Sequence, residues 1–314
     1  MMNRFLIAFL SCLGLALLGC RNQIQEQDTP SGWSQLESMP SARSEMPAVA
    51  LDGLIYVPGG FGDERAFEVY DPIANTWKSL TPLPEPRHHL MAAAFDGQIY
   101  IFGGAPSVIN WNPQNDAWVY DPARDSWSSR ANMPEARNAG AAVTLGEFIY
   151  IVGGTGVTNA LFRYDPVGDS WTTLAPLTIP REHTAAVALD GKIYALGGRW
   201  SDSGELNSVE IYDPVTNIWI EGVPMQVPRA GFAATILDGL IVVAGGEVLS
   251  GKNKTLASVE AFDPVSSQWI FWPDLPVPLH GVPAAGLEGV LFLLGGSDQA
   301  GGIENQGRTL RYSP

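Results

Sequence analysis

The four histidines of this chain all stand one or two residues after a recurring position that is usually an arginine. They are His88, His89, His183 and His280. Glu45 and Glu182 lie in the same part of their repeats, two residues after Arg43 and one residue after Arg181. Imidazole and carboxylate groups that meet from separate segments can bind a transition metal, sense pH or transfer a proton. The alternative interpretation is that each side chain is only a local hydrogen-bonding group.

The recurring position holds an arginine in five of its six copies. The copies are Arg43, Arg87, Arg137, Arg181 and Arg229, with Leu279 as the sixth. One interpretation is a set of guanidinium donors for the carboxylates of a peptide or an acidic sugar. The interpretation that we favour is that each arginine pairs with carbonyl or acidic groups of a neighbouring unit. A role repeated in five units is typical of architecture.

Fixed spacings place these residues in a repeat of 44 to 50 residues. Each unit contains a Gly-Gly pair at the end of an apolar run, then an aromatic residue followed in five units by Asp-Pro. A tryptophan comes seven residues after the aromatic residue, and the arginine position comes ten residues after the tryptophan. Asp-Gly or Glu-Gly pairs before most apolar runs predict tight hairpin turns. Each unit therefore predicts four short antiparallel strands, which we name a, b, c and d in chain order.

This pattern closely resembles the kelch repeat, whose hallmarks are a double glycine followed by a spaced Tyr and Trp. The resemblance covers residues 33 to 314 and implies an all-β fold, a six-bladed kelch β-propeller. Sialic acid mutarotases and galactose oxidase-type enzymes are more distantly similar propellers. In kelch domains that bind peptides, the face at the start of strand a does the binding, and such arginines can contribute. The resemblance implies the same for the five arginines here.

The two ends of the repeat region complement each other. The sixth unit stops at Pro314 without a strand d, while Trp33 has no strands a to c before it. Arg43 follows Trp33 by ten residues, as in the other units. We therefore expect the segment near Trp33 to be the outer strand of the sixth blade, which closes the ring without a covalent bond.

Only the distance from Gly-Gly to the aromatic residue varies, between 11 and 17 residues, so all length variation lies in the loops between strands b and c. These loops and the d–a connections are expected on one face, which is the predicted ligand-binding face. The b–c loops are at about 61–66, 105–117, 155–160, 199–207, 247–257 and 297–307. Trp111 and Trp200 break the repeat and lie in these loops, with Arg199 beside Trp200. Such side chains suit a sugar ring or a protein contact, or else a small core of the loop itself.

We expect no metal and no cofactor. The central channel of a propeller is expected to hold the histidine rings too far apart, and no ligand pair has a helical i, i+4 spacing. The periodic Trp and Tyr residues are interpreted as packing between blades.

The N-terminal segment resembles the signal of bacterial lipoproteins. Arg4 precedes a 14-residue apolar stretch, which is short for a spanning helix of about 20 residues. Leu17-Leu18-Gly19-Cys20 then resembles a lipobox, which implies cleavage before Cys20 and a lipid on its thiol. We expect a signal peptide at 1–19, a flexible tether at 20–31 and the propeller at 32–314. The protein would then be an extracytoplasmic, membrane-anchored lipoprotein of the outer membrane, periplasm or cell surface.

The charge composition limits the classes of partner that the chain can bind. The chain has 18 basic and 33 acidic side chains, which disfavours nucleic acid. We expect a monomer that binds a protein or glycan of the cell envelope through the predicted face. Its candidate contacts are Arg43, Arg87, His88, His89, Trp111, Arg137, Arg181, Glu182, His183, Arg199, Trp200, Arg229 and His280.

A sugar-processing enzyme of the mutarotase kind is the alternative function, with Glu182, Glu45 or Glu247 moving protons. No catalytic residue is singled out by spacing. The copper-radical chemistry of galactose oxidase-like enzymes needs a cysteine, and lipidation of Cys20 would leave the mature chain without a free thiol.

Overall fold

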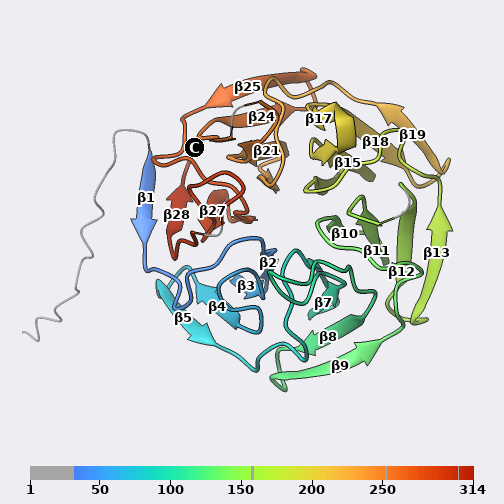
Figure 1. The fold of residues 1–314 in the computed structure, drawn as a ribbon, viewed down its shortest axis with the longest axis vertical. Helices are drawn as coiled ribbons and strands as arrows, with labels where there is room; N and C mark the ends of the chain where they lie inside the picture. The colour runs from blue at the N-terminus through green and yellow to red at the C-terminus, as the bar shows by residue number, and fades with distance from the viewer. Residues whose placement is uncertain (1–31, 157–158, 252, 303) are drawn as a thin grey trace, which may run out of the picture.

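The chain forms a ring of six four-stranded antiparallel sheets around a central channel (Figure 1). The computed structural model describes residues 32–156, 159–251, 253–302 and 304–314. The expected signal peptide, Cys20 and the tether lie outside the described residues. Among those that are described, no helix has the length and apolar character needed to cross a membrane. The predicted all-β, six-bladed propeller is confirmed.

Each blade runs from a strand at the channel to a strand at the rim. The innermost strands a are β2 (Val49–Leu51), β6 (Met91–Phe95), β10 (Ala141–Leu145), β14 (Ala185–Leu189), β20 (Ala233–Leu237) and β26 (Ala284–Leu287). Strands b are β3 (Leu54–Pro58), β7 (Gln98–Phe102), β11 (Phe148–Val152), β15 (Lys192–Leu196), β21 (Leu240–Ala244) and β27 (Val290–Leu294). Strands c are β4 (Phe67–Asp71), β8 (Ala117–Asp121), β12 (Leu161–Asp165), β18 (Val209–Asp213), β24 (Val259–Asp263) and β28 (Thr309–Tyr312). The outer strands d are β5 (Thr76–Ser79), β9 (Ser126–Arg130), β13 (Ser170–Leu174), β19 (Ile218–Glu221), β25 (Gln268–Trp272) and β1 (Trp33–Leu36).

The ring closes as the sequence predicts. Strand β1 pairs with β28 as the outer strand of the sixth blade, and Trp33 lies opposite Tyr312. The Trp33 side chain is buried, and its indole N–H donates to the Pro273 carbonyl across the gap to the fifth blade at 3.2 Å. The first and last segments of the fold are therefore joined by sheet pairing and packing alone.

Neighbouring blades are held together at the rim by a repeated contact. In the second blade, the Trp127 indole donates to the Thr81 carbonyl at 3.0 Å, while the Thr81 N–H donates to Asp125 at 2.9 Å. The Tyr120 hydroxyl donates to the same carboxylate at 2.6 Å. The repeated Trp and Tyr thus hold the segment that leaves the outer strand of the preceding blade, which supports their interpretation as packing residues.

The double glycine also has an inter-blade role. The Gly60 N–H donates to the Arg87 carbonyl of the next blade at 2.9 Å. A Cβ on Gly59 would lie 2.3 Å from that carbonyl oxygen, and one on Gly60 would lie 2.6 Å from the Ser44 carbonyl oxygen. Both positions must be glycine because the backbone of the d–a connections passes directly against them.

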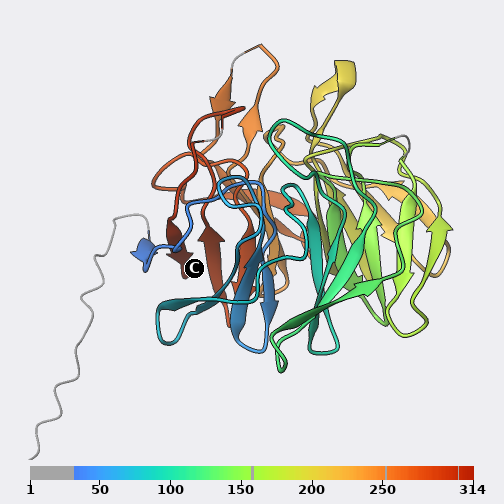
Figure 2. The ribbon, with the colours of Figure 1, turned by 60° about the horizontal axis from the view of Figure 1, so that its bottom comes forward.

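Turns and loops separate the two faces. The a–b turn at Asp52 and Gly53 has φ of 50° and 77°, as the Asp-Gly prediction requires. Two b–c loops that were expected to be irregular contain short hairpins. They are β16 (Arg199–Trp200) with β17 (Gly204–Glu205), joined by the 3-10 turn η1 (Ser201–Ser203), and β22 (Glu247–Val248) with β23 (Lys254–Thr255). Both project from the same face of the ring (Figure 2).

Candidate functional site

A closed circle of backbone hydrogen bonds surrounds the mouth of the channel on the face that carries the b–c loops. Each of its six residues stands two positions after the recurring arginine position and donates its N–H to the carbonyl of its counterpart in the preceding blade, at 2.7 to 2.9 Å. The six residues are Glu45, His89, Ala139, His183, Gly231 and Gly281. All six have φ between 48° and 58°, the left-handed region. We call this set the mouth ring.

The residue types in the mouth ring fit the backbone poorly at four positions, Glu45, His89, Ala139 and His183. Glycine adopts this conformation without strain, and Gly231 and Gly281 use that freedom. Glu45, His89 and His183 hold the same conformation against a cost of about 1 kcal/mol or more each. Ala139 has the same conformation, so the strain belongs to the ring as a whole, and the importance of the three polar side chains must be judged from their contacts.

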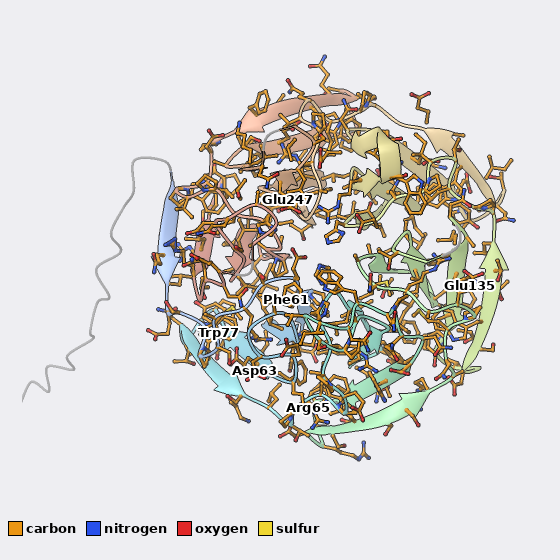
Figure 3. The ribbon with its side chains drawn as sticks, in the orientation of Figure 1. Phe61, Asp63, Arg65, Trp77, Glu135 and Glu247 are labelled. Carbon is orange, nitrogen blue, oxygen red and sulfur yellow. The ribbon has the colours of Figure 1, made fainter. Side chains whose placement is uncertain are left out.

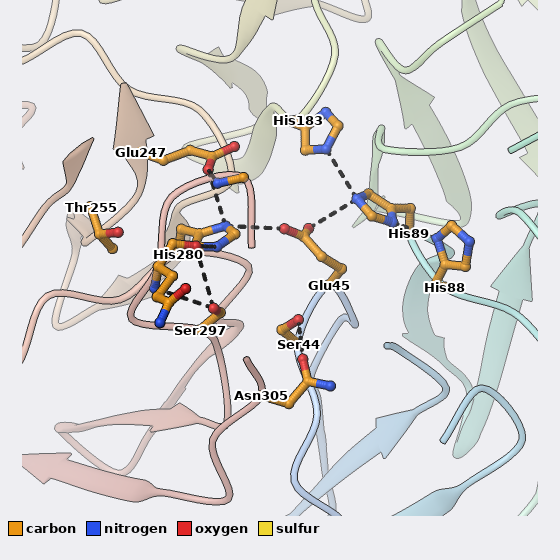
Figure 4. A network of polar contacts seen from close by, with 12 residues as sticks. Ser44, Glu45, His88, His89, His183, Glu247, Thr255, His280, Ser297 and Asn305 are labelled. Carbon is orange, nitrogen blue, oxygen red and sulfur yellow. Dashed lines mark hydrogen bonds and ion pairs between the residues drawn. The ribbon is translucent and has the colours of Figure 1, made fainter. Parts of the chain in front are cut away.

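These three side chains meet one another. His89 Nε2 lies 3.0 Å from His183 Nε2 and 3.2 Å from Glu45 Oε2 (Figure 4). The expectation that the channel holds the histidine rings too far apart to bind one metal ion together is therefore wrong for His89 and His183. The ligand atoms of Glu45, His89 and His183 all lie within 4.8 Å of one another, a grouping that can hold a metal ion.

The network continues around the channel. His280 Nδ1 lies 3.3 Å from Glu45 Oε1 and 3.4 Å from Glu247 Oε2, while His280 Nε2 donates to the Gln299 carbonyl at 2.7 Å. His183 Nδ1 bonds to the Glu182 carboxylate. His88 Nδ1 lies 2.6 Å from His89 Nδ1.

Arg199, at the start of β16, completes the network. Its guanidinium donates to Glu182 Oε1 and to Glu247 Oε1, both at 2.6 Å, and lies 3.2 Å from both ring nitrogens of His183. We call the whole set the mouth cluster: Glu45, His88, His89, Glu182, His183, Arg199, Glu247 and His280. It joins five of the six blades through side chains.

Burial and pairing set the charges of the mouth cluster. Burial lowers the pKa of His89 to about 3, so its ring is neutral at neutral pH. Burial alone would raise the pKa of Glu45, but His89 and His280 outweigh it and hold the pKa well below its usual range. Burial also opposes the charged form of His280, yet Glu45 and Glu247 beside it raise the pKa of His280. Such perturbed groups in one place are characteristic of functional sites.

Two cavities adjoin this region. The first, of about 180 Å³, is the channel itself, lined by the mouth ring and the starts of the six strands a. The second, of about 540 Å³, lies between the hairpin loops of the fourth and fifth blades, where Glu205, Pro228, Val248 and Lys254 line it. Its volume is typical of a small-ligand pocket.

Comparison with known proteins agrees with the repeat. Residues 26–179 match the model of the KLHDC2/KLHL20/DRC7 Kelch-repeats domain, and residues 180–226 and 228–276 match the Kelch motif. This chain is a kelch-repeat protein. A search of curated proteins found no match. Among solved structures, it is similar to "Structure of YjhT", with 18% sequence identity and a TM-score of 0.78 over 87% of this chain and 95% of that one. At this identity the likeness concerns the fold.

The five arginines of the kelch repeat point into the blades. All five are buried, at 0 to 5% exposure. Arg229, for example, donates to the Gly245 carbonyl at 2.6 Å, to the Ser258 carbonyl at 2.9 Å and to Glu260 at 2.6 Å. These partners belong to the blade that the arginine opens, not to the neighbouring blade. The main-chain carbonyl of the arginine, instead, reaches the glycine of the preceding blade.

The residue opposite each arginine on strand c changes with it. Arg43, Arg181 and Arg229 meet the carboxylates of Glu68, Glu210 and Glu260. Arg87 and Arg137 lie instead over the rings of Trp118 and Phe162, at 5.2 and 4.1 Å from the centroids. In the sixth blade the pair is Leu279 and Leu310, both buried in one apolar cluster. This matching favours the architectural interpretation of Arg43, Arg87, Arg137, Arg181 and Arg229.

The two aromatic candidates outside the repeat differ in their surroundings. Trp111 is 45% exposed, and its ring centroid lies 4.9 Å from that of His88 and 4.8 Å from that of His89. Trp200 is half-buried in β16, next to Arg199. Trp111 therefore covers one side of the mouth cluster and keeps part of its surface in solvent.

The sequence analysis did not identify Phe61 as a site residue and did not predict the mouth ring. Phe61 stacks on His88 with centroids 4.2 Å apart, from the first b–c loop, and nothing in its spacing indicated this contact. Figure 3 shows Phe61 and Glu247 on the inner part of the ring and Trp77 toward the rim. The place of Glu45 in the mouth ring did have a signal, because it stands two residues after Arg43 just as His89 follows Arg87.

Proposed function

We propose that this kelch protein is an extracytoplasmic binding module, anchored by a lipid on Cys20, that recognises a protein or glycan through the face around the channel mouth. One observation carries the proposal: the polar mouth cluster, the 540 Å³ cavity and the exposed Trp111 gather on the face that also carries the length-variable loops. A rigid ring with variable loops on one face is the arrangement that binding proteins use repeatedly.

The contacts that support recognition lie in the loops rather than in the repeat. Trp111 offers a partly exposed aromatic surface, and Trp200 and Lys254 stand on the two hairpins that rise from the same face. Aromatic side chains of this kind contribute strongly where a sugar ring or a protein anchor is buried against them. The five buried arginines of the repeat are not part of the proposed contact surface.

The test is binding of the purified full chain to glycan and peptide arrays, followed by titration of the best ligand. Trp111→Ala and Trp200→Ala should each weaken binding by about tenfold or more, which corresponds to a contact of 1.4 kcal/mol. Phe271→Ala is the matched control, because Phe271 is 55% exposed on the outer strand β25. Equal binding by all three variants would refute the choice of face.

The proposed anchor has its own test. Cells that produce the chain should incorporate labelled fatty acid into the wild type and not into Cys20→Ala. Incorporation that persists in Cys20→Ala, or a wild-type chain without label, would exclude the lipid anchor and leave the binding face untouched.

A carbohydrate isomerase is the second candidate, favoured by acid–base groups of Glu45, His89 and His183 beside the channel cavity. Proton transfer to and from a sugar needs such groups within hydrogen-bond reach of the substrate. The anomeric interconversion of sialic acid, followed by NMR, should be faster with the wild type than with Glu45→Gln. Equal rates with and without protein would exclude this activity for that sugar.

A further inference from the structure

Three hydrogen-bond acceptors converge at the channel mouth. The Glu182 carboxylate can only accept, so His183 Nδ1 must carry the proton of that bond. His89 Nδ1 and His88 Nδ1 share one proton between them. With that proton on His89, both His89 Nε2 and His183 Nε2 present lone pairs, 3.0 Å apart, and His89 Nε2 faces the Glu45 carboxylate at 3.2 Å.

In this tautomer the three side chains offer their acceptor atoms to one point, which is the arrangement that binds a cation. We propose that Glu45, His89 and His183 bind one divalent transition-metal ion, with Zn²⁺ as the best fit. Two imidazole nitrogens and one carboxylate oxygen are a known ligand set for this ion class, and three protein ligands leave a position for a water or ligand oxygen. In this chain that position faces the channel cavity.

The separations suit an ion of this size. Bonds of about 2.0–2.1 Å in a tetrahedron place ligand atoms about 3.3 Å apart. The distances of 3.0 Å between the two Nε2 atoms and 3.2 Å between His89 Nε2 and Glu45 Oε2 need only small adjustments to meet this value, and the ligand atoms of His183 and Glu45 lie within 4.8 Å of each other.

A second layer of contacts already orients each ligand. Metal-binding histidines usually donate their other ring N–H to a carboxylate or another acceptor. His183 does so to Glu182 and His89 to His88, while Glu45 Oε1 faces His280 Nδ1 at 3.3 Å. All three ligands are therefore held in place from behind.

The charge of the mouth cluster is consistent with a cation. Two of its three carboxylates, Glu182 and Glu247, pair with Nε and Nη1 of Arg199, while Glu45 faces His89 and His280. The cluster thus has more carboxylates than guanidinium groups in a mostly buried site, which favours a bound cation. Nη2 of Arg199 lies 3.2 Å from both ring nitrogens of His183, so an ion bound at His183 Nε2 would replace this contact.

The sequence of the mouth ring is consistent with this assignment. The three proposed ligands are its polar and charged members, and the other three members are Ala139, Gly231 and Gly281. Gly281 also makes room for the site, because a Cβ there would lie 2.6 Å from Glu45 Oε1.

The experiment titrates the full chain, freed of metal with a chelator, with Zn²⁺ by calorimetry and with Co²⁺ by visible absorption. We expect one ion per chain and a Co²⁺ band of tetrahedral intensity. His89→Gly and His183→Gly should each weaken Zn²⁺ binding by about 100-fold or more, and Glu182→Gln by about 10- to 100-fold. Glycine is chosen because it fits the left-handed backbone.

Ala139→Gly is the matched control, since it changes the same ring position without removing a ligand. It should leave the Zn²⁺ affinity within about twofold. X-ray absorption of the Zn²⁺-loaded wild type should show two imidazoles and oxygen ligands, a readout that depends on no variant. Absence of Zn²⁺ heat and of a Co²⁺ band, or binding that the two histidine variants leave unchanged, would overturn the proposal.

Discussion

The ion pair between Arg229 and Glu260 is closed off from solvent inside the fifth blade, with both side chains at 0% exposure. Arg229→Leu would leave Glu260 charged and buried, with only the N–H groups of Gln226 and Val227 as partners, at 2.7 and 3.1 Å. Breaking a buried pair in this way costs about 3–5 kcal/mol. The expected fall in the melting temperature is about 5–8 °C for a domain of this size.

The sixth blade shows how that cost can be avoided. Leu279 and Leu310 stand where the fifth blade has Arg229 and Glu260, and both are buried in one apolar cluster. An apolar pair of similar volume is often neutral relative to a buried ion pair. Arg229→Leu combined with Glu260→Leu should therefore be more stable than either single variant and within about 2 kcal/mol of the wild type. The remaining cost comes from the unpaired N–H groups of Gln226 and Val227.

Denaturant unfolding of the four proteins of this double-mutant cycle measures the coupling. The architectural interpretation requires a large coupling between the two positions and unchanged ligand or metal binding. A double variant that loses the sum of the two single losses would refute the reasoning. So would an Arg229→Leu variant of wild-type stability that no longer binds ligand.

Three further predictions address ring closure, the channel mouth and acid stability. Trp33→Ala should destabilise the fold by about 3–5 kcal/mol, measured by thermal unfolding, because the side chain is buried where the ring closes. Gly281→Ala should weaken Zn²⁺ binding by about tenfold or more in calorimetry, because its Cβ would lie 2.6 Å from Glu45 Oε1 and displace a proposed ligand. The Tyr120 hydroxyl, by its hydrogen bond, lowers the pKa of Asp125, so the resulting stability is present above the unfolded pKa of about 4 and lost as the pH falls through the folded value. Tyr120→Phe should therefore be less stable at pH 7 and lose less stability on acidification, as thermal unfolding between about pH 5 and 2 would show.

Each of these predictions has a matched control in another blade. Trp269→Ala changes the corresponding buried tryptophan of the fifth blade, which is continuous in the chain, so a loss as large as that of Trp33→Ala would contradict the special role of ring closure. Gly231→Ala imposes the same backbone strain as Gly281→Ala, but its nearest neighbour would lie 3.7 Å away, so Zn²⁺ binding should persist. In Tyr70→Phe the lost partner is the amide of Asn75, which has no charge to titrate, so an altered acid dependence there would contradict the assignment to the carboxylate.

The fold could be predicted from the sequence because its determinants are local and repeated. Gly-Gly, Asp-Gly and the Trp spacing each correspond to one contact that the blade must make, such as Gly60 against the carbonyls of Ser44 and Arg87. Closure through Trp33 was predicted from the strand missing at the C-terminus and from the ten-residue spacing between Trp33 and Arg43, and the pairing of β1 with β28 confirms it. The hairpins β16–β17 and β22–β23 were not foreseen, since they depend on contacts between loops, as where Glu205 accepts the N–H of Leu249 at 2.8 Å.

The sequence predicted which residues lie near the channel mouth, but not which of them contact one another. The histidines, Glu182 and Arg199 do meet, but the separation of the rings was misjudged because nothing in the sequence gives the diameter of the channel. The six residues of the mouth ring, all with left-handed backbone, are linked in a circle by hydrogen bonds and hold the starts of the blades close together. His89 Nε2 and His183 Nε2 therefore lie 3.0 Å apart. Repeats of the same sequence position thus become neighbours in space, although 94 residues separate these two histidines.

This geometry separates the structural from the functional residues of the repeat. The side chain at the arginine position points into its blade and matches its partner on strand c. An arginine there faces a glutamate or an aromatic ring, and the leucine of the sixth blade faces another leucine. Two residues later the left-handed backbone turns the side chain toward the channel axis, where six blades share one small volume. Glycine is compatible with that position, as Gly231 and Gly281 show. The glutamate and two histidines found there are therefore the residues of the repeat that the proposed metal site uses.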